Sequence, residues 1–395
     1  MSLENFVAVD IGASDTRFAT QNKAVYHIPN NMTFVPFDAN IEMDTQDRDI
    51  ERNLDISISR SPVSEDVKNI IENGEEFYPM HVLIGEVSDR YDSVDIRPNS
   101  DSGKMKQRCN HASCITAVAL SKLRNPNMGN NIDLFIALPP SEIKGFKNAI
   151  KKYMIGHYTV VFNRMTDPIQ RVVEFDIENV YCFEESRMAM ISYISSNTDK
   201  MANFANTVML SIDIGASTTD FVIFKNRVYM DKSGLTVAIG CNTLKEKLVQ
   251  IMRTKGISVS GDSVDMMVRE GRFQDGAKRV ADPDTVSEAK RQVADMIVNA
   301  FGSHLTLCGL TPRDVAYIIV SGGGSMQSGY IDDSGEFKST SGPMSEYITE
   351  HMKKLSPNSE VIPISDEPRL ANIKGLVMMA CAKLEQEKRK NQTVS

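Results

Sequence analysis

The apolar positions of the chain alternate with polar turns in a pattern that predicts two successive series of strands and helices. The first series opens with the strand FVAV (6–9), a turn, the strand TRFAT (16–20) and a third strand within KAVYHIP (23–29). Pro139 and Pro140 end a later strand, and Ser141 then begins a helix that has Glu142 in its first turn. The other elements predicted in this series, in chain order, are HVLIGEV (81–87), CNHASCITAVALSKL (109–123), NIDLFIAL (131–138), YTVVF (158–162), QRVVEFDIENVYCF (170–183) and EESRMAMISYI (184–194).

The second series repeats this plan from residue 208. Two strands again surround a turn, and the segment 256–310 is predicted to be largely helical, because its apolar positions have helical spacing. A closing helix is predicted at 367–386, followed by a charged, frayed tail. The remaining elements are VMLSID (208–213), DFVIF (220–224), NRVYMDK (226–232), the helix after Gly240 in GCNTLKEKLVQIM (240–252), and the strand and glycine turn of VAYIIVSGGGS (315–325).

The turn at the start of each series has nearly the same sequence. DIGASDTRF (10–18) and DIGASTTDF (213–221) match at seven of nine positions, and each follows an apolar strand. Two α/β lobes with matching strand–turn–strand openings are therefore expected. We place one domain at residues 1–205 plus 360–395 and the other at 206–359.

Composition narrows the class of protein. The 395 residues are 41% hydrophobic and 24% charged, which is typical of a globular chain of two domains. The start MSLENF lacks an apolar signal core and no apolar run approaches a membrane span, so we expect a cytoplasmic protein without membrane attachment. The net charge of −8 argues against direct nucleic-acid binding. Six cysteines without a CxxC pair indicate buried, reduced thiols, and CNHASC (109–114) lacks the further ligands of a structural zinc site.

Two polar stretches are harder to interpret. Residues 38–76 are acidic and rich in Asp, Asn, Ser and Arg, which predicts an irregular surface insertion with weak helical stretches and no assigned role. SDSGKMKQR (100–108) is predicted to be a basic, flexible loop. Within it, Lys104–Arg108 is either a solvated loop or a contact to a neighbouring acidic subunit.

The repeated turn is suited to binding phosphate. A tight turn of small residues leaves backbone N–H groups pointing one way, and such a nest binds anions. An aspartate beside a phosphate is repulsive unless a divalent cation lies between them, so Asp10 and Asp213 predict Mg²⁺. A lone hairpin turn would be the alternative, but two copies that each open a lobe favour phosphate binding. The predicted phosphate-binding residues are Gly12, Ala13, Ser14, Arg17, Gly215, Ala216, Ser217 and Thr218.

A third glycine turn, SGGGS (321–325), follows the apolar strand AYIIV directly. It is either a linker or a place where the backbone lies against a base or ribose, and its position after a buried strand favours the second interpretation. The chain has neither GxxxxGK[ST] nor GxGxxG, so a Walker-type loop and a dinucleotide fold are not indicated.

In this order the motifs resemble the actin-like ATPase superfamily, and most of all the plasmid-partitioning actin-like proteins of the ParM type. The resemblance spans nearly the whole chain. It is carried by VAVDIGASDTRF (7–18), LPPSEI (138–143), ENVYCFEESRMAM (178–190), SIDIGASTTDFVIF (211–224), LTVAIGCNTLKEKL (235–248), IIVSGGGSM (318–326) and RLANIKGLVMMA (369–380).

The resemblance implies a two-lobed actin/ribonuclease H-like α/β fold with a central nucleotide cleft. Asp10 and Asp213 would position Mg²⁺ and its waters, and Glu185, or Glu184 beside it, would orient or deprotonate the attacking water. The residues implied to line the adenosine are Gly240, Asn242, Gly322, Gly323, Gly324 and Ser325. Ala13 and Ala216 depart from the usual family residues at their positions.

The implied function is slow Mg²⁺-dependent hydrolysis of ATP, or of GTP, coupled to polymerisation. Such a filament would contact further copies of itself and segregate plasmid DNA through a DNA-binding adaptor protein. The alternatives are a cytoskeletal filament unrelated to plasmids, a small-molecule kinase, and a chaperone-type ATPase. A kinase would need an acceptor pocket with a carboxylate base, and a chaperone usually adds a peptide-binding domain after the ATPase.

Overall fold

The structure is a computed structural model that describes residues 5–39, 41, 53–91, 103–163, 171–200, 202–364 and 367–394. The chain divides into two compact units, which we call unit 1 (Met1–Met188 with Asn372–Ser395) and unit 2 (Ala189–Ala371). Helices α4 (Glu185–Ser196) and α9 (Ala371–Val394) carry the chain from one unit to the other. The domain boundaries expected from the sequence, after residues 205 and 359, stay a prediction.

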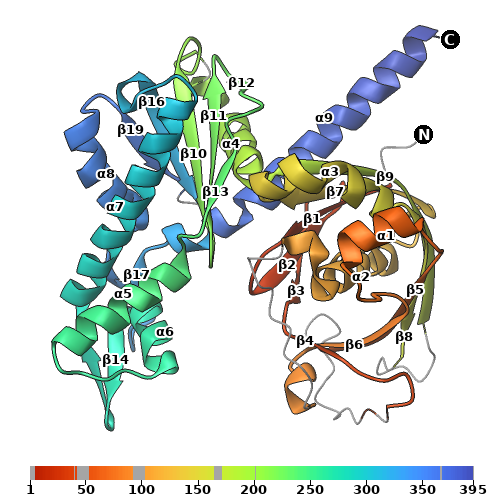
Figure 1. Ribbon diagram of the computed structural model, residues 1–395, viewed down its shortest axis with the longest axis horizontal. Coiled ribbons are helices and arrows are strands. Elements are labelled where there is room, and N and C mark those ends of the chain that lie inside the picture. Colours follow the sequence, from red (N-terminus) through yellow and green to blue (C-terminus); the bar gives the residue numbers. More distant parts are fainter. Residues whose placement is uncertain are drawn as a thin grey trace. The chain divides into compact units, whose positions relative to one another are not determined.

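Unit 1 is built on one large mixed sheet (Figure 1). Its described strands have the order β3-β2-β1-β7-β9-β8-β5-β6-β4. Strands β1, β7 and β9 are parallel neighbours, whereas β2 pairs with β1 in an antiparallel hairpin. The strands are β1 (Phe6–Ile11), β2 (Asp15–Ala19), β3 (Val25–Pro29), β4 (Met32–Phe34), β5 (Asn53–Arg60), β6 (Met80–Gly85), β7 (Asn131–Leu138), β8 (Gly156–Phe162) and β9 (Arg171–Glu184).

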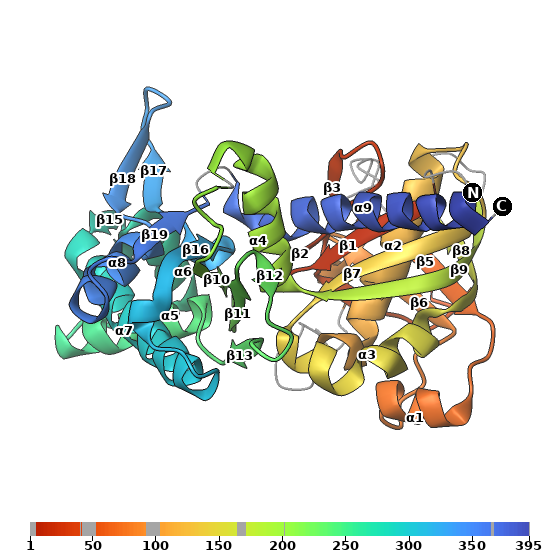
Figure 2. The same cartoon turned by 90° about the horizontal axis from the view of Figure 1, so that it is seen from above.

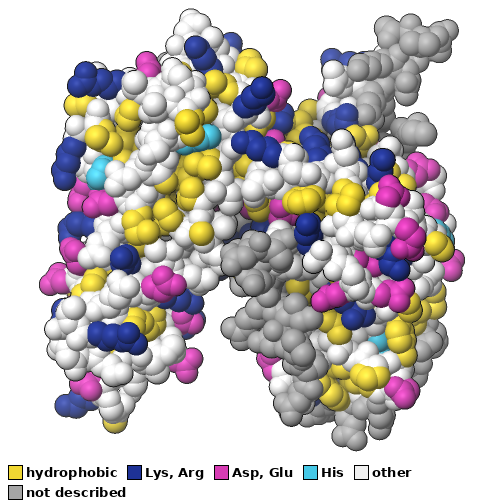
Figure 3. All heavy atoms as spheres, viewed as in Figure 1, with side chains coloured by type: hydrophobic (Ala, Val, Ile, Leu, Met, Phe, Trp, Pro, Cys, Tyr) yellow, Lys and Arg dark blue, Asp and Glu magenta, His cyan; other side chains and the backbone are white. Residues whose placement is uncertain are grey.

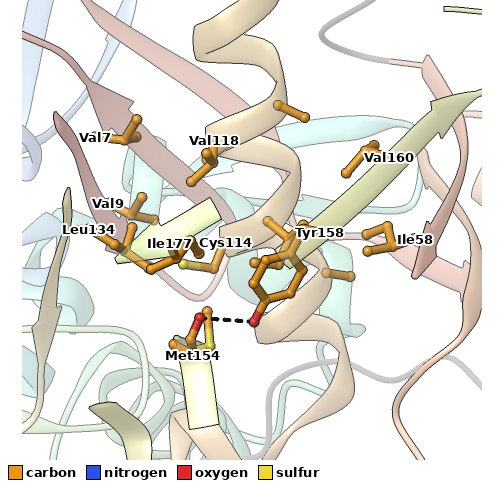
Figure 4. Close-up of a cluster of buried hydrophobic side chains, with 14 of the residues drawn as sticks. Val7, Val9, Ile58, Cys114, Val118, Leu134, Met154, Tyr158, Val160 and Ile177 are labelled. Carbon is orange, nitrogen blue, oxygen red and sulfur yellow. Dashed lines mark hydrogen bonds between the residues drawn. The ribbon is translucent and has the colours of Figure 1, made fainter. Parts of the chain in front are cut away.

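Helices cover both faces of this sheet. On one face, α2 (Arg108–Arg124) packs Cys114 and Val118 against β1 and its neighbours, as the buried cluster in Figure 4 shows. The helices α3 (Pro140–Met154) and α1 (Glu65–Glu72) follow on this side, where α3 packs on β9 and α1 packs on α3. On the other face α9 lies along the strands (Figure 2), with Lys383 Nζ 4.6 Å from the centre of the Tyr181 ring. Because both faces are covered, the strand β1 is buried along its whole length and most of β7 is buried too.

The stretch 38–76, expected to be an irregular surface insertion with weak helical stretches, contains a buried strand in addition to a helix. Leu54, Ile56 and Ile58 alternate with polar residues along β5 and are at most 2% exposed. Figure 4 shows Ile58 in the same buried cluster as Val160 of β8. The expectation of irregular structure was wrong here, because the period-two apolar pattern is interrupted by polar and charged residues. The part of the prediction that falls on 40 and 42–52 lies outside the described residues.

Residues 103–108, expected to be a flexible loop, are also ordered. They form the one-turn 3₁₀ helix η3 (Lys104–Lys106) and the start of α2, and the side chain of Met105 is buried. Residues 100–102 of that prediction lie outside the described residues. The turn determines where Lys104 lies.

Unit 2 contains a smaller sheet with the order β12-β11-β10-β16-β19, in which β13 also pairs with β11. Helices α5 (Cys241–Thr254), α6 (Gly261–Glu270), α7 (Pro283–Leu307) and α8 (Met344–Leu355) pack with it around one apolar core. The strands of the sheet are β10 (Val208–Ile214), β11 (Thr219–Lys225), β12 (Val228–Tyr229), β13 (Leu235–Val237), β16 (Val315–Ser321) and β19 (Glu360–Pro363).

Two hairpins lie outside this sheet. One, β14 (Arg272–Asp275) with β15 (Lys278–Ala281), interrupts the segment that was expected to be largely helical, and α6 and α7 flank it. The other, β17 (Ser328–Ile331) with β18 (Phe337–Ser341), projects from unit 2 in Figure 2. Within the described part of the chain, no helix combines the length and apolar character that crossing a membrane requires.

The two sheets share one topology. In unit 1 the order β3-β2-β1-β7-β9 contains an antiparallel hairpin followed by two parallel strands. In unit 2 the order β12-β11-β10-β16-β19 has the same senses. The expected matching openings of two α/β lobes are therefore present.

A core substitution tests the assignment of β5. We expect Ile56→Ala to lower the free energy of unfolding by about 2–5 kcal/mol, because it removes buried methyl groups and leaves a cavity. Ile70→Ala on α1 is the matched control: Ile70 is 43% exposed, so the same change should cost less than about 0.5 kcal/mol. Urea unfolding followed by circular dichroism measures both. Equal losses for the two variants would contradict a buried β5.

Candidate functional site

The first repeated turn connects β1 to β2 and is closed by its own backbone. The Gly12 N–H donates to the Asp15 carbonyl over 3.0 Å, and the side-chain amide of Asn30 donates to the Gly12 carbonyl. A Cβ at residue 12 would lie 2.8 Å from the Asp15 carbonyl oxygen, which is too close, so the turn needs glycine there. Within the described residues, the N–H groups of Ala13 and Ser14 make no backbone hydrogen bond.

Arg17 pairs with carboxylates of its own hairpin. Its Nη1 lies 3.1 Å from Asp10 Oδ2, and its Nη2 lies 2.6 Å from Asp15 Oδ1. Burial would lower the pKa of Arg17, but the charges of Asp10 and Asp15 raise it above its ordinary value. Burial likewise opposes ionisation of Asp15, yet Arg17 and hydrogen bonds from His27 and Ser14 lower the pKa of that carboxyl. The guanidinium of Arg17, which was expected to bind phosphate, therefore forms ion pairs with these two carboxylates.

The two adjacent glutamates of the crossing segment have different partners. Glu184, the last residue of β9, accepts a 3.4 Å hydrogen bond from Arg187 Nη1. Glu185, the first residue of α4, is 6% exposed and lies 2.5 Å from Lys104 Nζ. The same ammonium donates to the carbonyl of Ile11, at 2.7 Å, just before the first turn. Glu185 is thus the carboxylate that is linked to that turn.

The second repeated turn has the same backbone closure. The Gly215 N–H donates to the Thr218 carbonyl over 2.8 Å, and the N–H groups of Ala216 and Ser217 make no backbone hydrogen bond within the described residues. The register is also the same, because Asp10 faces Arg17 in one hairpin and Asp213 faces Asp220 in the other. The two copies therefore have one geometry and opposite charges at the facing position.

The start of α5 is fastened to the second turn. The N–H groups of Cys241 and Asn242 donate to the carbonyls of Gly215 and Ala216, at 3.1 and 2.8 Å. The side-chain amide of Asn242 donates to Ser217 Oγ over 3.0 Å. A Cβ at Gly240 would lie 2.7 Å from the Ala216 carbonyl oxygen, so only glycine lets the helix approach this closely.

The SGGGS turn reaches the same place in unit 2. Gly322 has φ +85°, and a Cβ there would overlap Asp213 Oδ1 and lie 2.7 Å from the Ile214 nitrogen. A Cβ at Gly324 would lie 3.1 Å from Cys241 Sγ. The turn is completed by Ser325, whose hydroxyl donates to the Gly322 carbonyl at 2.7 Å. Three elements distant in sequence therefore converge around Asp213.

The structure thus assembles the predicted residues into two groups. The first turn, Asp10, Arg17 and Glu185 form one group in unit 1. The second turn, Asp213, Gly240, Asn242 and the residues 322–325 form the other, in unit 2. The binding and catalytic roles assigned to these residues stay predictions.

Two lysines near these groups were missed by the sequence analysis. Lys104 has just been described. Lys290 on α7 is 1% exposed, and its ammonium donates to the carbonyls of Gly342 and Met326 at 2.8 and 3.4 Å. The carbonyl of Met326 lies just after the SGGGS turn. The amphipathic pattern of α7 identified its buried face, but nothing in that pattern distinguishes a buried lysine from a solvated one.

Comparison with known protein families gives a match. The sequence profile of the family described as "Archaeal actin homologue MreB-like, C-terminal" matches residues 211–329. No curated protein matches the sequence.

Similar folds are found among solved structures. The actin-like protein Alp7A has a TM-score of 0.67 at 15% identity, covering 99% of each chain. A ParM from a 15-stranded filament of Clostridium botulinum has a TM-score of 0.64 at 18% identity, covering 96% of this chain and 100% of that one. An archaeal actin homologue in complex with ADP has a TM-score of 0.61 at 15% identity, covering 95% and 99%.

The fold is therefore shared with these actin homologues. The predicted actin/ribonuclease H-like α/β fold is confirmed. The resemblance to actin-like ATPases is confirmed at the level of the fold, and ParM is among the similar structures.

Gly322 offers a test of the close approach in unit 2. Gly335, at the tip of the β17–β18 hairpin, has nearly the same φ (+81° against +85°) but no atom within 4 Å of an added Cβ. We expect Gly335→Ala to cost about 1–2 kcal/mol from its left-handed backbone alone. Gly322→Ala should cost about 1–3 kcal/mol more, since Asp213 and Ile214 have to shift. Chemical unfolding measures the difference, and similar costs would argue against tight packing at Gly322.

The buried Lys290 predicts a pH dependence of stability. Burial lowers the pKa of Lys290 to about 8 from its ordinary 10.5, although nearby Cys241 and Glu346 oppose this shift. Between these pH values the unfolded chain binds more protons than the folded one, so the free energy of unfolding should rise with pH. We expect the wild type to gain about 1–3 kcal/mol relative to Lys290→Met between pH 7.5 and pH 10. A constant difference between the two proteins would show that Lys290 titrates normally.

Proposed function

We propose that this protein binds ATP with Mg²⁺ and hydrolyses it slowly, and that it assembles with further copies of itself into filaments. The observation that carries the proposal is the pair of glycine turns in identical register, each with two consecutive N–H groups that make no backbone hydrogen bond within the described residues. Such amides bind phosphate oxygens. Each unit therefore has one turn that is suited to binding a phosphate group.

The residues of unit 2 fit a nucleotide. Gly240, Gly322 and Gly324 allow two other backbone segments to pack closely on the second turn and Asp213, where an added Cβ would collide with neighbouring protein atoms. We propose that the backbone of Gly240, Asn242 and the turn 322–325 lies against the ribose and base of the nucleotide. Solved relatives with the same fold include one in complex with ADP. Contacts through backbone favour neither ATP nor GTP, and we propose ATP.

The aspartates at the ends of β1 and β10 fit a divalent metal. Asp10 and Asp213 are both buried, and carboxylate oxygens are the ligands that Mg²⁺ prefers. Bound Mg²⁺ would neutralise charge on the phosphates and favour departure of the diphosphate. Asp10 already shares its Oδ2 with Arg17, so the two aspartates are not equivalent in this role.

Glu185 is the proposed base that activates the attacking water. It is buried beside Lys104, whose ammonium also contacts the end of β1, whereas Glu184 pairs with Arg187. A positioned carboxylate that accepts a proton from water typically contributes a factor of about 10²–10⁴ in rate.

Filament formation and plasmid segregation through an adaptor complete the proposal. The fold is shared with a ParM that forms a 15-stranded filament. On the face seen in Figure 3, acidic and basic side chains are interspersed, and the whole chain carries a net charge of −8. Binding to DNA would then require a basic adaptor protein, because an acidic protein is repelled by the phosphate backbone.

The test uses the purified full chain with Mg·ATP. We expect phosphate release, pelleting at micromolar protein, and filaments in negative-stain micrographs. Glu185→Ala should slow phosphate release about 10²-fold or more and leave filaments that persist, because hydrolysis no longer weakens them. Glu184→Ala is the matched control, since Glu184 is equally buried and pairs with Arg187, and it should change the rate by less than about threefold because it is not the proposed base.

Different failures would overturn different parts of the proposal. Absence of nucleotide binding by calorimetry would remove the ATPase. Hydrolysis without pelleting would remove the polymer alone, and a metabolite that is phosphorylated by ATP would indicate a kinase instead.

A further inference from the structure

The one-turn helix η3 (Lys104–Lys106) is held in place by buried polar side chains. The carboxylate of Glu142 on α3 accepts the N–H groups of Lys104 and Met105, the second at 3.0 Å. On α2, the Asn110 amide donates to the Lys104 carbonyl at 2.7 Å, and His111 Nε2 donates to the Met105 carbonyl at 2.8 Å. Glu142, Asn110 and His111 are each at most 5% exposed. We call these three residues the clamp.

Burying the three polar side chains of the clamp costs free energy. Burial raises the pKa of Glu142, although the two backbone N–H groups oppose the rise, and burial lowers the pKa of His111 to about 3. His111 is therefore neutral at physiological pH and acts as a donor from Nε2. Burying polar groups is unfavourable unless they are paired, so three of them around one turn indicate that the position of the turn matters.

The clamp positions the side chain of Lys104. Its ammonium donates to the carbonyl of Ile11, directly before the first turn, and to Oε1 of Glu185. Lys106, on the same turn, points elsewhere, with its ammonium 4.1 Å from the centre of the Phe146 ring. The two lysines have the same charge and nearly the same sequence position, but only one contacts the proposed site.

We propose that Lys104 is a further catalytic residue of this protein, whose ammonium contacts the terminal phosphoryl group of the bound nucleotide while it holds Glu185 beside that group. The inference rests on the proposed function and deepens it, because it names the cation that meets the transferred phosphate. Arg17, which the sequence predicted among the phosphate-binding residues, pairs with Asp10 and Asp15. Lys104 has 24% of its side chain exposed and lies where the first turn begins.

In the proposed hydrolysis, Lys104 stays protonated throughout. The water oxygen forms a bond to the terminal phosphorus, and the bond from that phosphorus to the bridging oxygen breaks. The proton of the water passes to Glu185, and the bridging oxygen leaves with its electron pair on the nucleoside diphosphate. Negative charge on the transferred group is stabilised by the Lys104 ammonium, which keeps all its protons.

The test compares Lys104→Met with Lys106→Met, which removes the same charge from the same turn. We expect Lys104→Met to lower kcat about 10²–10³-fold, as loss of a preorganised donor typically does. It should weaken binding of a non-hydrolysable ATP analogue by about tenfold and binding of ADP by less than threefold, because ADP lacks the terminal phosphoryl group. Lys106→Met should match the wild type, and Lys104→Arg should restore part of the rate.

Two further measurements separate a structural role from a catalytic one. Thermal unfolding of each variant shows whether it folds. Glu142→Gln keeps the ammonium and loosens the clamp, so it should lower kcat less than Lys104→Met does. Wild-type rates in Lys104→Met, or equal weakening of ADP and the ATP analogue, would overturn the proposal. If the wild type itself binds no nucleotide, the proposed function fails first, and the binding titration shows this independently of any variant.

Discussion

The hydrogen bond that closes each repeated turn is the constraint on which the proposed site depends. A glycine N–H donates to the carbonyl three residues later, from Gly12 to Asp15 and from Gly215 to Thr218. Because the glycine makes this bond, the next two N–H groups are left without a backbone acceptor within the described residues. The strands on either side are buried in the middle of a sheet and cannot move easily. The geometry that we propose binds anions is therefore a property of the backbone, fixed by the sheet.

Side chains then make the two copies different. At the position that faces the aspartate, unit 1 has Arg17 and unit 2 has Asp220, which accepts a 2.6 Å hydrogen bond from Thr236. The first turn thus adds positive charge near its aspartate, whereas the second adds negative charge. A duplicated backbone with opposite charges would let the two copies differ in the metal and phosphate binding that we propose for them.

The sequence predicted the features that are local and repeated. The strand–turn–strand openings follow from DIGAS after an apolar strand, and α2, α5 and α9 follow from helical spacing. It did not reveal β5, whose three apolar residues alternate with polar ones and could equally belong to a solvated stretch. It also missed Lys104 and Lys290, because their partners are distant in the chain and a lysine on its own indicates only charge. The pairing of Arg17 with Asp10 required the register of the hairpin to be known.

Gly375 in α9, close to the C-terminal end of the sequence, packs against α4, which lies nearly 190 residues earlier. An added Cβ at this residue of α9 would collide with the carbonyl of Met188, so α9 packs directly on the first turn of α4, the turn that begins with Glu185. During synthesis on the ribosome, the strands and turns of unit 1 can form long before residue 375 emerges. The segment that carries Glu185 gains this contact only afterwards, so final positioning of the carboxylate proposed to activate water would be among the last events in biosynthesis.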